Sequence, residues 1–534
     1  MVPDLSYDKA LSALMGPEHQ AKTPEEVKAA SERRTRTISD MHEYWRRIFR
    51  QDEQGATTTP PPPFRRVIHV AGTKGKGSTS IMCEAICRHR YGMNTGLFTS
   101  PHLIDIRERI RVNGRPVSRQ IFAEAYWEVR QRLETGATTS NYDATLPVLP
   151  GYFRMLTLLG LFIFGHHVEP ALDVIILEVG LGGRYDATNI LPMTEYPTVA
   201  GVTLLDYDHV RVLGHRIEEI AWEKAGVFQV QKGPSGQSSI RPFTDGWDPD
   251  AMIDSKVAST TRTFYALDSN TESAVKVLKT CAHVEGQGSQ LVLVGSQHPS
   301  FGMPTNVTLG LAGRHQRENA ALAVALTSEL YQKYGQDDFV DQGADAMYQG
   351  LAQVSWPARC QAVVHGAHTF RLDGAHTIQS IQAGLEWFTS VRNPERPAVL
   401  CFNCSHERDP VELLSLLYNA GFDRVLFCRS DSTRPSMVAK KGAREYMEDN
   451  GIAVVEEYLP ETPETWQQTL ASIWKHLGTN EAPVDSDLSA SDAVATLGTA
   501  EAEVFVTGSL YLVGSVLTVI DWKEEDAHGK LFIQ

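Results

Sequence analysis

Short apolar runs alternate along the chain with longer segments of helical spacing. The first run, residues 67–71, is rich in β-branched side chains and precedes a glycine-rich loop and an apolar helical segment. Similar runs occupy residues 95–99, 173–179 and 198–203. Near-continuous apolar strands that alternate with helices are typical of a parallel sheet buried on both faces. We therefore predict an α/β fold with a P-loop-type, mostly parallel sheet flanked by helices.

The same alternation returns in the C-terminal third of the chain. It restarts at residues 356–359, whose sequence is Trp-Pro-Ala-Arg. Apolar runs then predict strands at residues 370–373, 398–402, 424–428 and 503–506. This pattern indicates a second, smaller α/β domain of Rossmann-like type. Residues 482–499 lack the pattern, and we expect a loop there.

Other segments complete the predicted organisation. Residues 1–50 have the spacing of two amphipathic helices, and residues 51–63 form a stiff proline-rich connector. Residues 229–309 have little periodicity, so we expect an irregular insertion with short antiparallel strands. Residues 313–332 are rich in Ala and Leu and predict a helix. The predicted divisions of the chain are residues 1–63, 64–355 and 356–534.

Composition and charge narrow the class of protein. A chain of 534 residues is long enough for two or three domains. Its 42% hydrophobic and 22% charged residues are typical of a soluble globular protein. The net charge of −15 argues against nucleic acid or an anionic membrane as a partner. No apolar run reaches the roughly 18–20 residues of a membrane span.

The cysteines and the N-terminus bear on cellular location. Seven cysteines, an odd number in a long chain, favour a reduced compartment. Cys401 and Cys404 form a lone CxxC near His406, whereas a zinc site would need a second pair. Residues 1–8 lack the apolar core of a secretory signal and do not look like a transit peptide. We expect a cytoplasmic protein, with a mitochondrial form as the alternative.

The most informative motif follows the first predicted strand. Gly72, Gly75 and Gly77 are spaced around Lys76 and lead into a helix. Backbone N–H groups of such a loop and the positive end of the helix dipole bind polyphosphates, and the lysine adds a charge. A standard P-loop would have glycine at Val70 and a hydroxyl residue at Gly77. We predict a nucleotide-phosphate loop, with a glycine-rich structural turn as the alternative.

Reactive residue types follow the other predicted strands. Ser100, Pro101 and His102 come after one strand, Glu178 ends another, and His209 follows a third. Ligands bind at the carboxyl edge of open α/β sheets, where these residues should meet. A buried carboxylate must be paired or bind a metal, and Mg²⁺ takes one or two carboxylates with phosphate oxygens. Glu178 is thus a predicted magnesium ligand; a structural ion pair and ordinary surface turns are the alternatives.

Four further polar groups lie at the ends of predicted elements. Lys224 ends a helix, and residues 312–319 open an otherwise apolar helix, which suits a contact to a nucleotide. Residues 372–376 and 506–511 each follow a predicted strand. Helix caps, polar turns and solvated side chains are the alternatives for these groups.

Taken together and in this order, the motifs resemble those of the folylpolyglutamate synthases, a branch of the Mur-type ATP-dependent amide ligases. The resemblance covers roughly residues 65–230 and 310–410 and the turn near residue 507. It is closest for eukaryotic members, because Gly-Thr-Lys-Gly-Lys-Gly and Asp-Gly-Ala-His-Thr are typical of them. The resemblance implies ATP-dependent addition of L-glutamate to the γ-carboxylate of a reduced folate. The implied partners are small molecules, and we expect a monomer.

The resemblance also implies roles for individual residues. Lys224 matches the lysine that is carbamylated in this superfamily, and Mg²⁺ is implied, with K⁺ or another monovalent cation as a further candidate. The implied catalytic residues are Lys76, Glu178, His209 and Lys224. The implied magnesium ligands are Ser100, Glu178 and His209. The implied ATP-binding residues are Gly72, Thr73, Lys74, Gly75, Lys76, Gly77, Ser78, Asn319, Arg359, Asp373 and His376. The implied substrate-binding residues are Ser100, Pro101, His102 and Ser509.

The chain departs from the family pattern at two single positions, and its segment 403–409 keeps Arg408 and Asp409 but differs around them. Asp206 stands where the family commonly has glycine, and Tyr511 stands where histidine is usual. These departures leave the acceptor substrate more open than the ATP chemistry. Dihydrofolate synthase, which adds glutamate to dihydropteroate, shares the motifs and is the first alternative. A P-loop NTPase that acts as a binding module and a catalytically inactive relative are the others.

Overall fold

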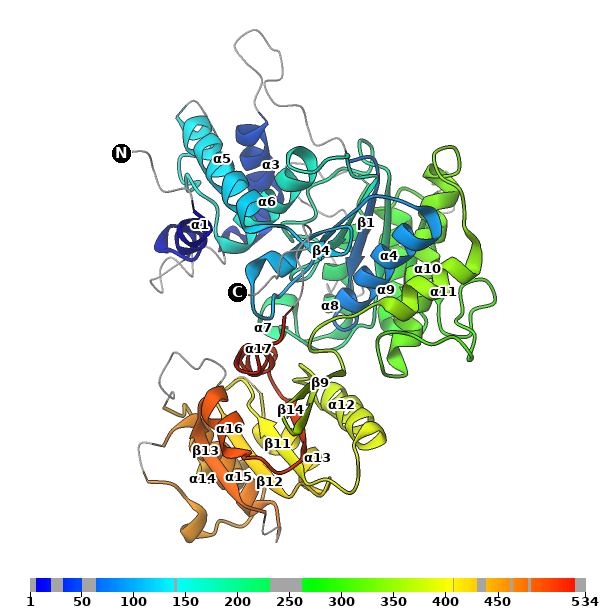
Figure 1. Ribbon diagram of the computed structural model, residues 1–534. Helices are drawn as coiled ribbons and strands as arrows, with labels where there is room; N and C mark the ends of the chain where they lie inside the picture. The colour runs from blue at the N-terminus through cyan, green and yellow to red at the C-terminus, as the bar shows by residue number, and fades with distance from the viewer. Residues whose placement is uncertain are drawn as a thin grey trace.

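Two α/β units, each built around its own sheet, lie one above the other in the computed structural model (Figure 1). The structure describes residues 6–20, 32–49, 64–138, 142–230, 262–406, 408–429, 438–461, 464–478 and 482–523. The predicted proline-rich connector lies outside the described residues. No described helix is both long and apolar enough to cross a bilayer. The predicted class, α/β with two domains, is confirmed.

The first unit contains a sheet of eight described strands in the order β4-β3-β2-β5-β1-β6-β7-β8. The strands are β1 (Val67–Ala71), β2 (Thr95–Phe98), β3 (Ile110–Val112), β4 (Arg115–Pro116), β5 (Val174–Glu178), β6 (Thr198–Val202), β7 (Thr263–Leu267) and β8 (Gln290–Val294). From β2 to β8 all neighbours are parallel, whereas β3 and β4 form an antiparallel edge. The prediction of a mostly parallel sheet is therefore confirmed.

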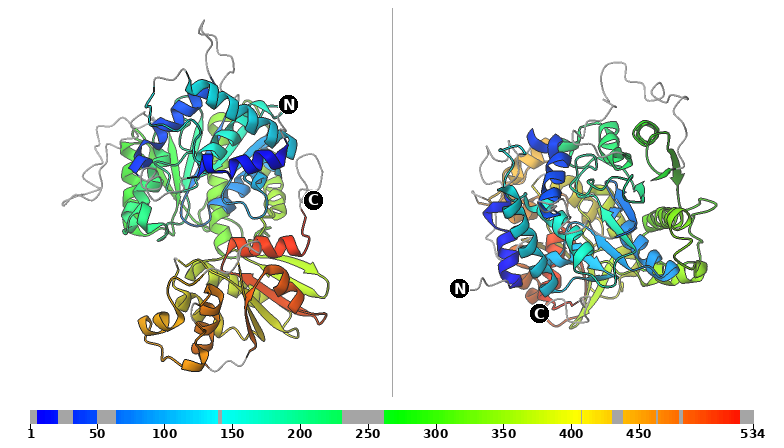
Figure 2. Two further views of the ribbon diagram at one scale, coloured as in Figure 1. Left: turned by 90° about the vertical axis from the view of Figure 1, so that its left-hand side faces the viewer. Right: turned by 90° about the horizontal axis from the view of Figure 1, so that it is seen from above.

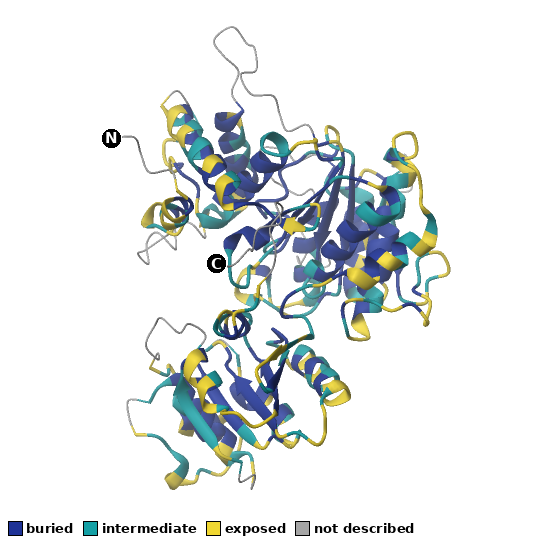
Figure 3. Cartoon of the chain, viewed as in Figure 1, coloured by how far each residue is buried: buried dark blue, intermediate teal, exposed yellow. Residues whose placement is uncertain are grey.

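Helices cover both faces of this sheet, which explains its near-continuous apolar strands. Side chains of a strand alternate between faces, and in β5 Ile175 and Leu177 join one core while Val174 and Ile176 join the other. The first face is covered by α1 (Tyr7–Leu14), α3 (Thr37–Ile48), α5 (Arg119–Ala137), α6 (Tyr152–His166), α8 (Ile217–Lys224) and η4 (Ala225–Phe228). The second is covered by α4 (Lys76–Tyr91), α10 (His315–Tyr334) and α11 (Gly343–Gln353). Figure 3 shows the strands as the buried layer between these helices.

The region 229–309 differs from its prediction. Its described part contains β7, α9 (Glu272–Val284) and β8, and both strands pair in parallel with the main sheet. The expectation of short antiparallel strands was wrong. Ala274, Val277, Leu278 and Cys281 are buried on one face of α9, at the spacing of an amphipathic helix. The strand–helix alternation thus continues through this region.

The second unit contains a sheet of six described strands in the order β13-β12-β11-β14-β10-β9, and among these only β9 runs antiparallel to its neighbour. Its strands are β9 (Gln361–His365), β10 (His368–Leu372), β11 (Ala398–Phe402), β12 (Arg424–Cys428), β13 (Val484–Leu488) and β14 (Ala502–Thr507). Its helices are α12 (Ile378–Val391), α13 (Pro410–Tyr418), α14 (Ala443–Asp449), α15 (Trp466–His476), α16 (Ala490–Thr496) and α17 (Leu510–Val519). The four predicted strands are confirmed.

The loop expected at residues 482–499 was wrong, because this segment forms β13 and α16. β13 is the edge strand of the sheet, and all five of its residues are only partly buried. Its sequence, Val-Asp-Ser-Asp-Leu, therefore carries too few apolar residues to resemble a central strand.

Short helical turns complete the described structure. They are η1 (Pro17–His19), η2 (Arg33–Arg36), η3 (Ile106–Arg109), η6 (Glu456–Tyr458) and the four-residue α7 (Val210–Leu213).

Helix α17 lies at the junction of the two units, as Figure 1 and the left view of Figure 2 show. It packs directly on the loop that follows β2. A Cβ atom added to Gly514 of α17 would lie 2.3 Å from the carbonyl oxygen of Leu103. This helix–loop contact therefore requires glycine, and it fixes how closely the second unit approaches the first.

Gly514→Val is expected to destabilise the junction by about 1–3 kcal/mol, because the added side chain has no room against backbone. Thermal unfolding and small-angle X-ray scattering would measure the loss of stability and a larger radius of gyration. Thr518→Ala, an exposed position of the same helix, is the matched control. Unchanged scattering and unfolding for Gly514→Val would contradict the tight contact.

Candidate active site

A cavity of about 400 Å³ lies at the carboxyl ends of the strands of the first sheet and is closed by the second unit. The first unit contributes residues 73–78, Ser100, Pro101, Glu178, His209 and the start of α10. The second unit contributes Arg359, Asp373, His376 and the first turns of α12. Most of the residues predicted for ATP and metal binding therefore line one cavity.

The phosphate loop fits between neighbouring elements only because it contains glycine. Gly75 precedes the first residue of α4 with φ of 85°, and a Cβ there would lie 2.3 Å from Asn319 Oδ1. Gly72 has φ of 143°, and its Cβ would come within 1.8 Å of Thr203 Oγ1. The loop thus turns tightly against β6 and α10. It directs the N-terminus of the 16-residue α4 toward the cavity, the arrangement that binds phosphate.

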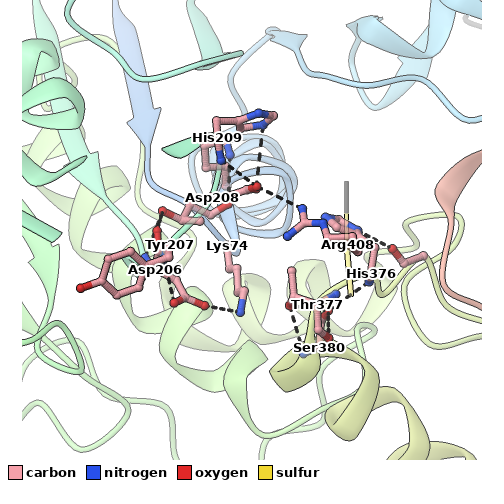
Figure 4. A network of polar contacts seen from close by, with 12 residues as sticks. Lys74, Asp206, Tyr207, Asp208, His209, His376, Thr377, Ser380 and Arg408 are labelled. Atoms are coloured by element: carbon pink, nitrogen blue, oxygen red, sulfur yellow. Dashed lines mark hydrogen bonds and ion pairs between the residues drawn. The ribbon is translucent and has the colours of Figure 1, made fainter. Parts of the chain in front are cut away.

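The two lysines of the loop have different surroundings. Lys76 lines the cavity, and its Nζ donates to the carbonyl oxygen of Thr73 at 3.2 Å. Lys74 instead donates to Asp206 Oδ2 at 2.5 Å and to Gln379 Oε1 of the second unit at 2.8 Å (Figure 4). Asp206, one of the departures from the family pattern, therefore neutralises Lys74. Only Lys76 remains as the free charge of the loop.

Glu178 lies beside the phosphate loop. It is 4% exposed, and its Oε2 accepts the backbone N–H of Ser100 at 2.9 Å. Burial raises the pKa of this carboxyl, and Lys76 opposes that shift. A Cβ at Gly77 would contact Glu178 Oε2 at 3.5 Å, so the missing side chain leaves room next to the carboxylate.

This donor set suits a metal that is shared with phosphate. One carboxylate and the Ser100 hydroxyl lie beside the loop, and Mg²⁺ commonly keeps phosphate and water ligands. Across the described ranges, no three His, Cys, Asp or Glu side chains gather into a metal-binding cluster. The described residues therefore do not form a metal site in which all ligands come from the protein.

His209 lies at the rim of the cavity. Its side chain is 59% exposed, and its φ of 51° places it in the left-handed region just before α7. The neighbouring Asp208 accepts from Arg408 Nη2 of the second unit at 3.1 Å, as Figure 4 shows. Asp208 and Lys74 thus each join the first unit to the second.

Lys224 lies beneath the phosphate loop rather than in the cavity. Its buried Nζ donates to the carbonyl oxygen of Gly72 at 2.8 Å. Burial and the nearby Lys76 lower the pKa of Lys224 to about 7. A substantial fraction of this amine is therefore uncharged at neutral pH.

The predicted nucleotide residues of α10 and the second unit are held by local contacts. Asn319 is buried and donates to Gln316 Oε1 at 3.0 Å. Asp373 accepts the backbone N–H groups of Cys360 and Ala375, at 2.8 Å and 2.9 Å. These bonds fix the Asp373 carboxylate at the cavity wall.

The structure separates four predicted residues from the main cavity. Gly72 and Lys224 lie behind the loop, and His102 lines a smaller adjoining cavity of about 30 Å³. Ser509 caps α17, where its Oγ accepts the backbone N–H of Leu512 at 3.4 Å.

Several lining residues were not predicted. They are Gly180, Leu204, Asp208, Leu267, Cys360, Thr377, Gln379, Ser380, Ala383 and Gly384. The other lining residues without an individual role, His315, Gln316, Glu318, Gly374, Ala375 and Leu510, belong to the polar groups singled out in the sequence. Leu267 could have been predicted from its position at the end of a strand. That strand was missed because residues 229–309 were interpreted as an irregular insertion.

Relatives of known identity cover nearly the whole chain. It is 32% identical over 543 aligned positions to folylpolyglutamate synthase of Saccharomyces cerevisiae, which covers 97% of this chain and 87% of the yeast protein. The chain belongs to the folylpolyglutamate synthase family. No protein-family model matches it.

Two mammalian folylpolyglutamate synthases, both named as mitochondrial, match over shorter segments. The Bos taurus protein is 36% identical over 387 residues, which is 68% of this chain and 59% of the bovine protein. The Homo sapiens protein is 33% identical over 444 residues, which is 78% of this chain and 66% of the human protein. The matched segment thus spans less than two thirds of the bovine relative.

Solved folylpolyglutamate synthases share the fold. The Mycobacterium tuberculosis enzyme complexed with ADP and AMPPCP superposes with a TM-score of 0.62 at 21% identity, covering 96% of this chain and 99% of that one. The E. coli FolC complex with DHPP and ADP gives 0.61 at 22% identity, covering 97% and 99%. The folylpolyglutamate synthase fold therefore extends over both units.

Gly75→Ala is expected to abolish tight nucleotide binding, because the new Cβ would collide with Asn319 and the backbone would be strained by about 1–2 kcal/mol. Gly92→Ala is the matched control at the other end of α4, where φ is also left-handed but open space surrounds the Cβ. It should lower stability without weakening nucleotide binding. Calorimetric titration with ADP would separate the two, and equal ADP affinities would contradict the role of the loop.

Proposed function

We propose that this protein uses ATP to add L-glutamate to the γ-carboxylate of tetrahydrofolate and its polyglutamates. One observation carries the proposal. A phosphate loop, a buried carboxylate and residues of a second α/β unit line a single cavity in a chain of the folylpolyglutamate synthase family. The relatives bear this activity in their names.

The chemistry follows from the poor reactivity of a carboxylate. Its direct substitution would have to expel oxide. Attack of the carboxylate on the γ-phosphorus of ATP instead breaks the bond to the β–γ bridging oxygen, releases ADP and gives an acyl phosphate, from which phosphate can leave. The amine of glutamate then attacks the acyl carbon through a tetrahedral oxyanion and expels phosphate. Lys76 and the N-terminus of α4 stabilise the phosphate charge that develops in these steps.

Glu178, Ser100 and His209 would hold Mg²⁺ next to the phosphates. When bound, the ion neutralises charge on two anions that must approach each other. Glu178 Oε2 accepts the backbone N–H of Ser100, and a Cβ at Gly77 would lie 3.5 Å from Oε2 and 3.6 Å from Oε1, so the carboxylate lies beside the loop. K⁺ or another monovalent cation remains a prediction.

The second unit would complete the ATP site. Arg359, Asp373 and His376 line the cavity opposite the phosphate loop, and Asn319 supports that loop from α10. Closure of the second unit over ATP would exclude water from the acyl phosphate. The division at residues 63 and 355, a cytoplasmic location and a monomer remain our predictions.

Dihydrofolate synthase remains the first alternative, because it would use the same residues on dihydropteroate. A P-loop NTPase without an acceptor would leave Glu178, Lys224 and the second unit without a role. Incorporation of labelled glutamate with MgATP, into tetrahydrofolate and separately into dihydropteroate, distinguishes these activities. Product with tetrahydrofolate alone supports the proposal; ATP hydrolysis without product on either acceptor contradicts it.

Lys76→Ala is expected to lower the rate of glutamate incorporation by about 10²–10³-fold, because one electrostatic donor to the phosphates is lost. Lys279→Ala, an exposed lysine of α9, is the control for removal of a lysine charge. Circular dichroism should be native for both variants. A rate within about twofold of wild type for Lys76→Ala would remove the phosphate role.

Lys224→Ala is expected to lose activity that short carboxylic acids partly restore, because the native side chain would act as a carbamate. Carbamate forms from the uncharged amine, and a pKa lowered to about 7 means that this form increases as pH rises through 7. NMR with ¹³C-bicarbonate should therefore detect a carbamate signal that Lys224→Arg lacks. Normal activity of Lys224→Ala without added acid would contradict this role.

A further inference from the structure

Arg109 belongs to the same edge of the sheet as the cavity. Phe98 pairs with Leu177 on β5 and with Ile110 on β3, so the next positions, Glu178, Thr99 and Arg109, are neighbours across three strands. The N–H of Thr99 donates to the carbonyl oxygen of Arg109 at 3.0 Å. Adjacent strands are about 4.8 Å apart, so the backbones of Arg109 and Glu178 are separated by about 10 Å.

The guanidinium of Arg109 is buried and forms no ion pair with a described carboxylate, although Glu178 and Glu108 are near enough to act on its charge. Arg109 is 7% exposed, and its Nε donates to His102 Nδ1 at 2.8 Å. Its other contact is the ring of Tyr152, whose centroid lies 5.8 Å from the guanidinium carbon. No carboxylate of the described chain forms an ion pair with Arg109.

The nearby carboxylates are already engaged. Glu108 accepts three backbone N–H groups of the loop before η3, and Glu178 accepts one. Asp105 pairs with Arg107, two residues from Arg109, at 2.9 Å. Arg107 is thus a structural cation with its own counter-ion, whereas Arg109 is not. A buried charge is costly unless it is paired, and Glu108 and Glu178 are shared with backbone N–H groups, so a further anion from a ligand would stabilise Arg109.

The surroundings of Arg109 connect it to the acceptor side of the site. Its hydrogen-bonded partner His102 lines the small cavity that also contacts Ser100 and Glu178. Tyr511, in the first turn of α17, is 62% exposed, and its neighbour Leu510 lines the same small cavity as His102. Arg109 therefore lies where the second unit meets the loop after β2.

We propose that Arg109 binds the α-carboxylate of a glutamyl group, the carboxylate that does not react. The planar guanidinium of Arg109 can donate two parallel hydrogen bonds to a carboxylate. Only its Nε donates to His102, so both Nη groups can donate to the ligand. The glutamyl group belongs either to the folate tail or to the incoming glutamate. This inference rests on the proposed function, which brings both groups to this cavity.

The first test is steady-state kinetics of the full-length protein with Arg109→Gln. We expect the KM for one glutamyl substrate to rise about 10–100-fold, as for loss of a charged hydrogen bond, with the KM for ATP unchanged. Arg109→Lys should be intermediate, because an ammonium keeps the charge and loses the fork. Arg65→Gln, an exposed arginine before β1, controls for net charge. Thermal unfolding identifies a variant that fails to fold.

Substrate analogues identify which carboxylate is bound. 4-Aminobutyrate replaces glutamate without its α-carboxylate, and tetrahydropteroyl-4-aminobutyrate does the same for the folate tail. The wild-type protein should bind one of these analogues more weakly than the natural substrate. Arg109→Gln should bind that analogue about as weakly as it binds the natural substrate, because the substitution and the missing carboxylate remove the same interaction. Such non-additivity is not expected of a residue that is merely structural.

Additive effects for both analogues, or a rise in the KM for ATP alone, would overturn the role of Arg109. Ligation by wild type would then still support the proposed function. If wild type forms no product, the proposed function fails, and calorimetry with tetrahydrofolate diglutamate and with glutamate tests Arg109 directly. Weaker binding of either ligand to Arg109→Gln would support the site, and unchanged binding of both would overturn it.

Discussion

The close approach of the phosphate loop to β6 and α10 is the constraint on which the site depends. A side chain at position 72 would collide with Thr203, and a side chain at position 75 would collide with Asn319, so both positions require glycine. The loop is therefore fixed by backbone packing from both sides. That packing fixes the start of α4, so the N–H groups and Lys76 are in position without further ordering when phosphate arrives.

The lysine and arginine side chains around the cavity contrast with the negative net charge of the whole chain. The protein carries a net charge of −15, yet the proposed substrates ATP, folate and glutamate are all anions. Asp206 neutralises Lys74, and burial reduces the charge on Lys224 by lowering its pKa. Lys76 and Arg109 form no ion pair with a described carboxylate. Their positive charge is thus available where the proposed substrate anions would bind.

The sequence predicts those parts of the structure that local pattern specifies. The central strands are buried on both faces, and their ends carry Ser100 and Glu178 to one cavity. The edge strand β13 is half-exposed and polar, so it lacks such a signal. The bond from Lys74 to Gln379 joins residues 305 positions apart and depends on how the units dock. For Asn319, the polar start of its helix suggested a contact to a nucleotide, but its contact with Gly75 could not be predicted because it is equally non-local.

Both single-residue departures from the family pattern fall at the junction of the two units. Asp206 holds Lys74, which in turn reaches Gln379 on α12. Tyr511 lies in the first turn of α17, the helix whose Gly514 packs on the loop after β2. Neither residue alters the glycines of the phosphate loop or the contact between Glu178 and Ser100. We therefore expect these departures to act on docking of the second unit and on the acceptor, while the phosphate chemistry stays that of the family.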